Sequence, residues 1–251
     1  MKVRLIEGAS TTEAQWLGAG GIATLPAVSM RQLLGAAARL VVVAPHPDDE
    51  ILMAGGLLQQ YLAAGQTALL VAVTDGEASH PRSSIWPVAR LQKLRPGESR
   101  EALTRLGLDQ PDMLRLGFAD GGLQTQMVAF EQALAAVIGR GDVVLTTWRL
   151  DGHPDHDACG AASASVAAAA DASLIEAPVW MWHWSTPSDP RVPWARAKKL
   201  HLSAEQIWRK QHAIDAFTSQ LAADESTGAA PILAANVLMR VRREFEVYFV
   251  N

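Results

Sequence analysis

The chain has 251 residues, of which 49% are hydrophobic, and a formal net charge of −4 at pH 7. This length and apolar content suffice for one α/β domain with a buried core. The acidic balance excludes a protein built to bind nucleic acid or an anionic membrane. The single cysteine, Cys159, excludes a disulfide framework and a cysteine-rich zinc site.

The chain shows no signal-peptide pattern at its start and no apolar run near the ~20 residues of a membrane span. We therefore expect a cytoplasmic protein. From residue 40 onward, the hydrophobic pattern alternates between short β-branched runs and longer helical periods. In chain order we predict a strand at 40–45, a helix at 50–64, a strand at 67–74, a helix at 98–108, a strand at 113–118, a helix at 125–140, a strand at 142–148, a helix at 155–170, a strand at 174–184, a helix at 204–222 and a strand at 244–250.

This alternation predicts an α/β fold with a doubly wound, mainly parallel, Rossmann-like sheet and helices on both faces. Residues 78–97 have no clear period and contain three prolines, so we predict a long loop there. Residues 1–39 precede the first clear strand. We expect them to be an N-terminal extension packed on the domain as an added edge element, with residues 40–251 forming a single catalytic domain.

Two clusters of histidine and aspartate follow two of the predicted buried strands. The first is HPDDE at residues 46–50, and the second is DGHPDHD at residues 151–157. Imidazole and carboxylate are the usual protein ligands of zinc in hydrolytic sites. In open parallel sheets, sites form beyond the carboxyl ends of the strands, which is where both clusters fall. Together the clusters indicate a mononuclear metal site.

Each cluster also has a simpler interpretation when it is taken alone. The carboxylates of residues 48–50 would cap a helix start and face its dipole, and residues 151–157 would form a solvated loop. Both clusters nevertheless follow buried strands, and together they hold three of the seven histidines of the chain. That coincidence favours the metal site.

The two clusters resemble the signature motifs of the LmbE-like, or PIG-L, family of zinc-dependent de-N-acetylases. HPDDE at 46–50 and HPDH at 153–156 carry the resemblance, which extends from about residue 40 to about residue 220. Between them, TDGE at 74–77, RPGE at 95–98 and LGFADG at 116–121 are similar to weaker landmarks of the family, as is FTSQ at 217–220 after them. Residues 1–39 lie outside the resemblance.

The resemblance implies the roles of nine residues. The expected metal ligands are His46, Asp49 and His156. Asp48 would be the general base, His153 would face the substrate carbonyl, and Asp155 would orient His153. The substrate-binding residues would be Glu77, Arg95 and Asp120; their simpler interpretation is surface ion pairs.

The chemistry of these groups agrees with those roles. Three ligands leave zinc an open position for a water whose pKa falls from about 16 toward ~7. Asp48, next to a ligand but pointing elsewhere, can take the proton of that water and return it to the leaving amine. A protonated His153, held by the Asp155 carboxylate, would stabilise the developing oxyanion. Fe²⁺ and Co²⁺ accept the same ligands as Zn²⁺.

Tryptophans supply candidates for a sugar-stacking platform. Trp180, Trp182 and Trp184 alternate on the predicted strand 174–184 and so would share one face, where core packing is the simpler role. Trp86 in the long loop is the second candidate.

We therefore expect a zinc-dependent N-deacetylase that acts on a small N-acetylated substrate of amino-sugar type. A metal-dependent lyase or hydratase on the same scaffold and a non-catalytic ligand-binding protein are the alternatives. We expect neither nucleic-acid nor membrane partners, and homo-oligomerisation stays open.

Overall fold

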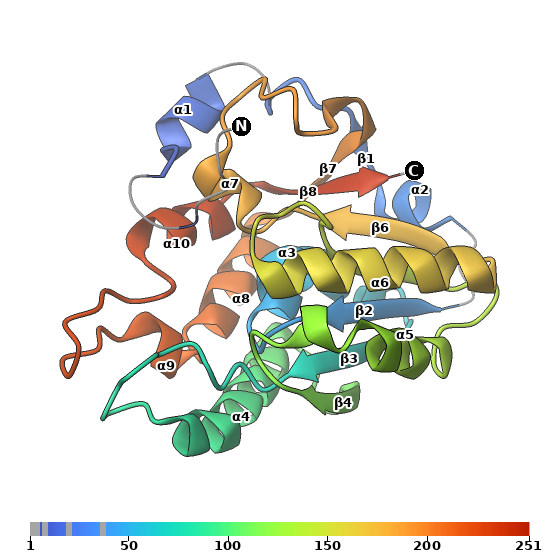
Figure 1. Cartoon of the computed structure of the whole chain (residues 1–251). Coiled ribbons are helices and arrows are strands. Elements are labelled where there is room, and N and C mark those ends of the chain that lie inside the picture. The colour runs from blue at the N-terminus through green and yellow to red at the C-terminus, as the bar shows by residue number, and fades with distance from the viewer. Residues whose placement is uncertain (1–5, 7–9, 19–21, 36–38, 251) are drawn as a thin grey trace.

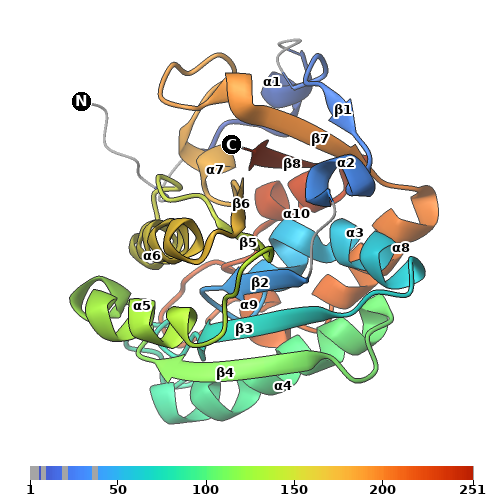
Figure 2. The ribbon, with the colours of Figure 1, turned by 90° about the vertical axis from the view of Figure 1, so that its right-hand side faces the viewer.

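A computed structural model describes residue 6 and residues 10–18, 22–35 and 39–250. Its centre is one sheet with the strand order β1-β7-β8-β6-β5-β2-β3-β4 (Figures 1 and 2). Every neighbouring pair is parallel except those of β8, which runs antiparallel to β6 and β7. The strands are β1 (Ala27–Val28), β2 (Leu40–Ala44), β3 (Ala68–Thr74), β4 (Asp112–Phe118), β5 (Val143–Thr147), β6 (Ser173–Ala177), β7 (Ala197–His201) and β8 (Phe245–Val250).

Helices cover both faces of this sheet, which confirms the predicted doubly wound architecture. Helices α5 and α6 lie on one face, and α3, α4 and α8 lie on the other (Figure 2). The helices are α1 (Glu13–Gly18), α2 (Met30–Leu34), α3 (Asp49–Ala63), α4 (Val88–Leu106), α5 (Met127–Ala135), α6 (Pro154–Ala170), α7 (Met181–Trp184), α8 (Ala204–Ile214), α9 (Thr218–Leu221) and α10 (Ala235–Val241). Within the described residues, none of these helices is both long enough and apolar enough to cross a membrane.

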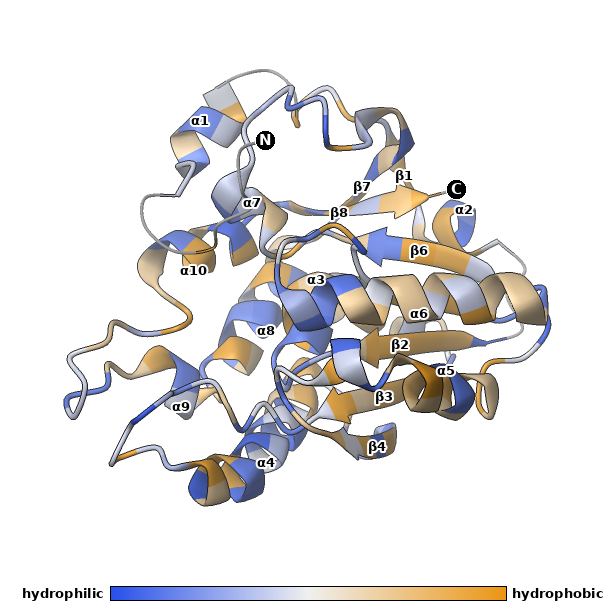
Figure 3. Cartoon of the chain, in the orientation of Figure 1, coloured by the Kyte–Doolittle hydropathy of each residue, from blue (hydrophilic) through white to orange (hydrophobic). Residues whose placement is uncertain are grey.

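Strand β2 is apolar throughout because both of its faces are covered (Figure 3). Val41 and Val43 pack into the core beneath α5 and α6. Leu40 and Val42 point the other way, into the core shared with α3, α4 and α8. A continuous β-branched run is what a central parallel strand requires, since successive side chains point to opposite faces.

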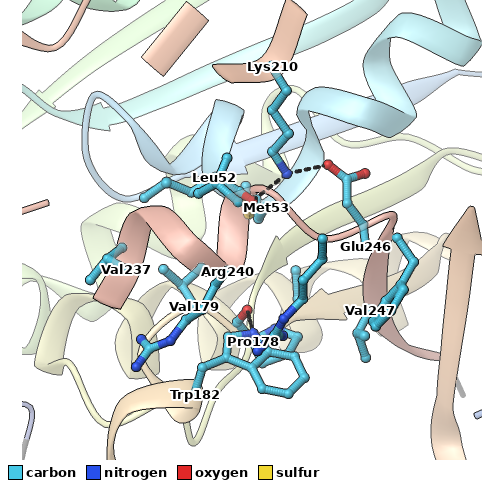
Figure 4. Close-up of a pocket in the computed structure, with 14 residues that line it drawn as sticks. Leu52, Met53, Pro178, Val179, Trp182, Lys210, Val237, Arg240, Glu246 and Val247 are labelled. Atoms are coloured by element: carbon cyan, nitrogen blue, oxygen red, sulfur yellow. Dashed lines mark hydrogen bonds and ion pairs between the residues drawn. The ribbon is translucent and has the colours of Figure 1, made fainter. Parts of the chain in front are cut away.

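Helix α3 approaches its neighbours closely at Gly56. A Cβ atom there would overlap the Leu202 side chain, so only glycine fits. Beside it, Glu246 of β8 forms a buried ion pair with Lys210 of α8 and accepts the backbone N–H groups of Gly56 and Leu57 (Figure 4). Because each charge has a partner, the pair ties α3, α8 and β8 together without leaving a buried charge unsatisfied.

The N-terminal region contributes the edge strand β1, which pairs in parallel with β7. Trp16 of α1 is fully buried and packs edge-to-face on Trp182, with 4.9 Å between the ring centroids. Strand β7 was not among the predicted elements. Its sequence, AKKLH, contains too few apolar residues to indicate a strand, and pairing with β8 and β1 forms it.

The predicted loop 78–97 is wrong in its second half. Helix α4 begins at Val88 and continues through Pro96 and Gly97. Proline lacks an N–H group and usually ends a helix. Here the helix persists because its tertiary contacts outweigh the local penalty: Arg95 is 2% exposed, and Leu91 and Leu103 are buried in the core.

The predicted strand 174–184 is also wrong beyond Ala177. The chain turns there into the short helix α7, so the three tryptophans do not share the face of a strand. The predicted helix 204–222 is divided into α8 and α9 by residues 215–217, and the predicted helix 125–140 is shortened to α5.

Candidate metal centre and active site

The candidate site lies where the carboxyl ends of β2 and β5 meet. From β2 the strand order continues in one direction, to β3 and β4, and from β5 it continues in the other direction, to β6. A crevice therefore opens between the adjacent strands β2 and β5. A cavity of about 710 Å³ occupies this position, a volume typical of small-molecule sites, which span about 300–1,000 Å³. Of the nine predicted site residues, all except Asp155 and Glu77 line it.

Two histidine side chains converge on one carboxylate oxygen of Asp49 in the cavity. Asp49 Oδ2 lies 3.2 Å from His46 Nδ1 and 3.2 Å from His156 Nε2. His156 Nε2 is buried and has no hydrogen-bond partner among the described residues. Two imidazole nitrogens and a carboxylate facing one another suit a divalent cation. The donor set and His156 Nε2, which makes no hydrogen bond within the described part of the chain, therefore fit a metal held by the three predicted ligands.

The far nitrogen of each histidine is held by carboxylates. His156 Nδ1 lies 2.8 Å from Asp151 Oδ2. His46 Nε2 lies 3.1 Å from Asp120 Oδ1 and 3.3 Å from Asp155 Oδ2. Carboxylates that accept the far N–H group fix the imidazole tautomer and leave the near nitrogen free to bind metal.

The electrostatics of the cluster favour a cation. Burial alone would lower the pKa of His156, but Asp49 and Asp151 outweigh it and raise that pKa to about 9. The pKa of His46 is likewise raised by its carboxylate neighbours against the effect of burial. Asp49 is buried too, yet the two histidines hold its pKa well below its ordinary value. The cluster thus favours positive charge, which a divalent ion would supply.

Two further groupings of potential ligands share His46. The ring nitrogens of His46, His153 and His156 lie within 4.8 Å of one another, as do ligand atoms of His46, Asp120 and Asp155. In the second grouping both carboxylates face His46 Nε2, so they orient the ring. The first grouping places His153 beside the expected ligands.

Asp48 stands at the turn between β2 and α3 with a strained backbone. Its φ of 136° lies in a region that residues other than glycine rarely adopt, a strain of about 1–3 kcal/mol that concentrates at functional sites. Glu50 holds the turn by accepting the Asp48 backbone N–H at 3.0 Å, and Ser99 donates to Glu50 in turn. These hydrogen bonds therefore hold the strained turn that carries Asp48.

Arg95 of α4 anchors the same turn. Its guanidinium donates to the carbonyls of Gly76 and Pro47 and lies 3.1 Å from Asp48 Oδ2. Burial raises the pKa of Asp48 to about 7, with the Arg95 charge opposing and the Asp49 charge adding to that rise. A carboxylate with a pKa near neutrality suits a general base. Arg95, predicted to bind substrate, is placed by its contacts as a partner of Asp48.

His153 and Asp155 interact differently from the prediction. The backbone N–H of Asp155, and not its carboxylate, donates to His153 Nδ1 at 3.2 Å. The Asp155 carboxylate instead accepts the backbone N–H groups of Gly121 and Leu123 and faces His46. Burial and the neighbouring histidines His156 and His46 lower the pKa of His153 to about 3. With Nδ1 accepting, the neutral ring carries its proton on Nε2.

The remaining predicted substrate-binding residues lie at the strand ends, but they contact protein groups. Asp120 accepts the Ala78 N–H and faces His46. Glu77 accepts the Asp120 N–H at 3.0 Å and does not line the cavity. Together they join the loop after β3 to the loop after β4, beside His46.

Of the four candidate tryptophans, only Trp180 lines the cavity. Trp182 is buried in the core with Trp16. Trp184 packs near Trp148 and donates to the Asp151 carbonyl. Trp86 is covered by the Arg90 guanidinium, 4.4 Å from its ring centroid. The structure therefore leaves Trp180 as the candidate platform.

Sequence reasoning assigned no role to Asp151. This fully buried carboxylate accepts His156 Nδ1–H and the backbone N–H groups of Val179, Trp180 and Met181. It joins His156, an expected metal ligand, to the loop that carries Trp180. Its place in the second cluster, five residues before His156, was the available signal.

Replacing Asp151 by asparagine is expected to weaken metal binding by about tenfold to a hundredfold. In Asp151 one carboxylate oxygen accepts from His156 and the other accepts the Val179 N–H. An asparagine has only one acceptor oxygen, so it cannot accept from both groups at once. Chelator competition measures the metal affinity. Asp157→Asn is the matched control, since Asp157 in the same cluster accepts the Gly152 N–H. Unchanged affinity in Asp151→Asn would show that Asp151 does not prepare His156 for metal.

Comparison with known proteins agrees with this geometry. The family model of PIG-L, described as GlcNAc-PI de-N-acetylase, matches residues 41–167. A deacetylase of Rhodococcus erythropolis named for 1D-myo-inositol 2-acetamido-2-deoxy-alpha-D-glucopyranoside is 30% identical over 181 residues, which are 62% of this chain and 60% of that protein. The enzyme of the same name from Mycobacteroides abscessus is 38% identical over 82 residues, 30% of this chain and 29% of that protein. The chain thus spans less than two thirds of the length of these relatives.

Solved structures share the fold. The N,N'-diacetylchitobiose deacetylase of Pyrococcus horikoshii superposes with a TM-score of 0.59 at 17% identity, covering 78% of this chain and 75% of that one. The conserved protein TT1542 of Thermus thermophilus superposes with a TM-score of 0.58 at 25% identity, covering 84% and 93% respectively.

Proposed function

The chain belongs to the PIG-L family of de-N-acetylases, and from that membership we propose that it is a metal-dependent hydrolase which removes the acetyl group from an amino-sugar-type substrate. The observation that carries the proposal is the convergence of His46 Nδ1 and His156 Nε2 on Asp49 beside Asp48, within one cavity. We further propose residues 40–251 as one catalytic domain, with residues 1–39 as an extension packed on it.

A divalent cation held by His46, Asp49 and His156 would polarise the amide carbonyl and acidify a water molecule. Asp48 takes the proton of the attacking water, because its carboxylate lines the cavity and its pKa lies near neutrality. The same carboxyl then returns the proton to the amine as the C–N bond breaks. Acetate and a free amine are the products.

His153 stabilises the oxygen on which negative charge develops. Its Nδ1 accepts the Asp155 backbone N–H, so its Nε2–H is the donor available to the substrate. The low pKa of His153, about 3, makes this donor the neutral imidazole and not the imidazolium expected from the sequence. Bound positive charge nearby would favour the neutral form further.

The substrate class rests on the relatives, whose names specify a 2-acetamido-2-deoxy-glucopyranoside. Zinc is the metal we propose, and the same two imidazoles and carboxylate also accept Fe²⁺ or Co²⁺. Acetate release from simple N-acetylglucosaminides by the zinc-loaded protein tests the proposal. Substrate consumed without acetate would favour a lyase or hydratase, and binding without any turnover would favour a non-catalytic protein.

The pH dependence of kcat/KM follows from the Asp48 carboxyl. Its pKa is raised from 3.8 to about 7 by burial, and the base works only when deprotonated. Activity should therefore be present at high pH and fall as the pH drops through this value, with bound metal moving the midpoint lower. In Arg95→Gln the opposing charge is lost, so the acid limb should move to higher pH. Arg95→Lys, which keeps the charge, is the control; identical limbs in both variants would contradict this role for Arg95.

A further inference from the structure

The catalytic cavity has an apolar wall built from three separate segments. Leu52 comes from α3, Trp180 from the turn before α7, and Ile232 and Val237 from the connection between α9 and α10 and from α10 itself. Figure 4 shows Leu52 and Val237 where this wall borders a smaller cavity behind it. Apart from Leu52, these residues lie outside residues 41–167, the stretch matched by the family model.

The side chains of the wall are available to a ligand. Leu52, Trp180 and Ile232 are each half-buried, while the wall is continuous with the core through Val237. An apolar ligand that fills this concave space would remove the apolar surface of these half-buried side chains from water, which favours binding. A polyhydroxylated group packed on these four side chains would instead place its hydroxyls against carbon and lose hydrogen bonds to water.

The charges around the cavity disfavour an anionic group. Arg95 is the one Lys or Arg side chain among the described lining residues, and it is 2% exposed with its donors directed at Asp48 and two carbonyls. Asp48 and Asp120 add negative charge beside the metal cluster. Among the described residues that line this cavity, a phosphate or carboxylate on the substrate would thus meet Asp48 and Asp120 and no lysine or arginine side chain other than the engaged Arg95.

Resting on the function proposed above, we propose that the preferred substrate is an N-acetylated amino-sugar glycoside with an uncharged, apolar aglycone. The acetamido group lies at the metal cluster, and the aglycone packs against the wall of Leu52, Trp180, Ile232 and Val237. An aglycone of alkyl or aryl chemistry packs better against this wall than an inositol such as that in the names of the relatives. The relatives share the reaction, and the wall sets the specificity.

Acetate release from methyl, butyl and hexyl glycosides of N-acetylglucosamine tests the inference, with the zinc-loaded enzyme. Each added methylene that is buried should raise kcat/KM by about twofold to fourfold, so the hexyl glycoside should exceed the methyl glycoside by at least about thirtyfold. The inositol glycoside and the sugar 1-phosphate should both be poorer than the butyl glycoside. Equal kcat/KM along the alkyl series, or a preference for the phosphate, would overturn the inference.

Variants of the wall residues test whether the gain in kcat/KM per methylene arises at the wall. Ile232→Ser and the isosteric Val237→Thr should each reduce the gain per methylene, while Val128→Ser, a change at a 71% exposed position on α5, should leave it intact. An undiminished gain in both wall variants would also overturn the inference. The two proposals fail differently: acetate released equally from every glycoside refutes only the apolar wall, and no acetate from any glycoside refutes the deacetylase function.

Discussion

Replacing Asp48 by asparagine is expected to lower kcat for acetate release by about a hundredfold to ten-thousandfold, the usual contribution of a general acid–base group. Asparagine keeps the size of the side chain and its contact with Arg95 but cannot take a proton. The metal content should not change, because Asp49 and the two histidines hold the ion in our account. Elemental analysis and steady-state kinetics on the same preparation check both halves of this prediction.

Asp215→Asn, at an exposed position after α8, is the matched control and should retain full activity. If Asp48→Asn lost its metal while Asp49→Asn kept it, the roles of the two adjacent carboxylates would be exchanged. The two carboxylates have different partners, which makes the distinction sharp: Asp48 pairs with Arg95, and Asp49 lies between His46 and His156.

The variants His153→Ala and His156→Ala are both expected to lose activity, but for different reasons. Without His156 one of three ligands is gone, so metal should be lost or greatly weakened. Without His153 the metal should remain, and kcat should fall by about a hundredfold or more as the donor to the oxyanion disappears. Metal analysis and kinetics of the two variants check this. Comparable metal loss in both would make His153 a ligand, as its closeness to His46 and His156 allows.

The pH profile of His153→Ala extends the same comparison. An imidazolium at this position, as the sequence suggested, would give a basic limb that vanishes in the variant. The pKa of about 3 instead keeps the ring neutral throughout the working range. We therefore expect the limbs of the residual activity to stay where they are in the unaltered protein.

The fold was predictable wherever burial leaves a clear hydrophobic pattern in the sequence. Strand β2 is a continuous apolar run and β5 begins with one, because both faces of these strands are covered, and both strands were recognised. Strand β7 was missed because an edge-proximal strand with two lysines has no such pattern. Pro96 likewise concealed part of helix α4, whereas the alternating tryptophans indicated a strand where the chain forms helix α7; in both places tertiary contacts override local propensity.

The site was predictable in its residues but not in its connections. Motif and strand position together brought His46, Asp49 and His156 to one point of the fold. Which carboxylate orients which histidine depends on backbone directions that no spacing reveals. Asp155 was expected behind His153 and lies instead beside His46, while Asp151 supports His156. The apolar wall joins α3 to the α9–α10 connection, and only the folded chain brings these together.

The central claim is that a single metal ion at the junction of β2 and β5 is required for amide hydrolysis. The most direct measurement is acetate release from an N-acetylglucosaminide as zinc is added back to chelator-stripped protein. We predict that activity is absent without metal and rises in proportion to bound metal until one ion is held per chain. Full activity in demonstrably metal-free protein would contradict the account.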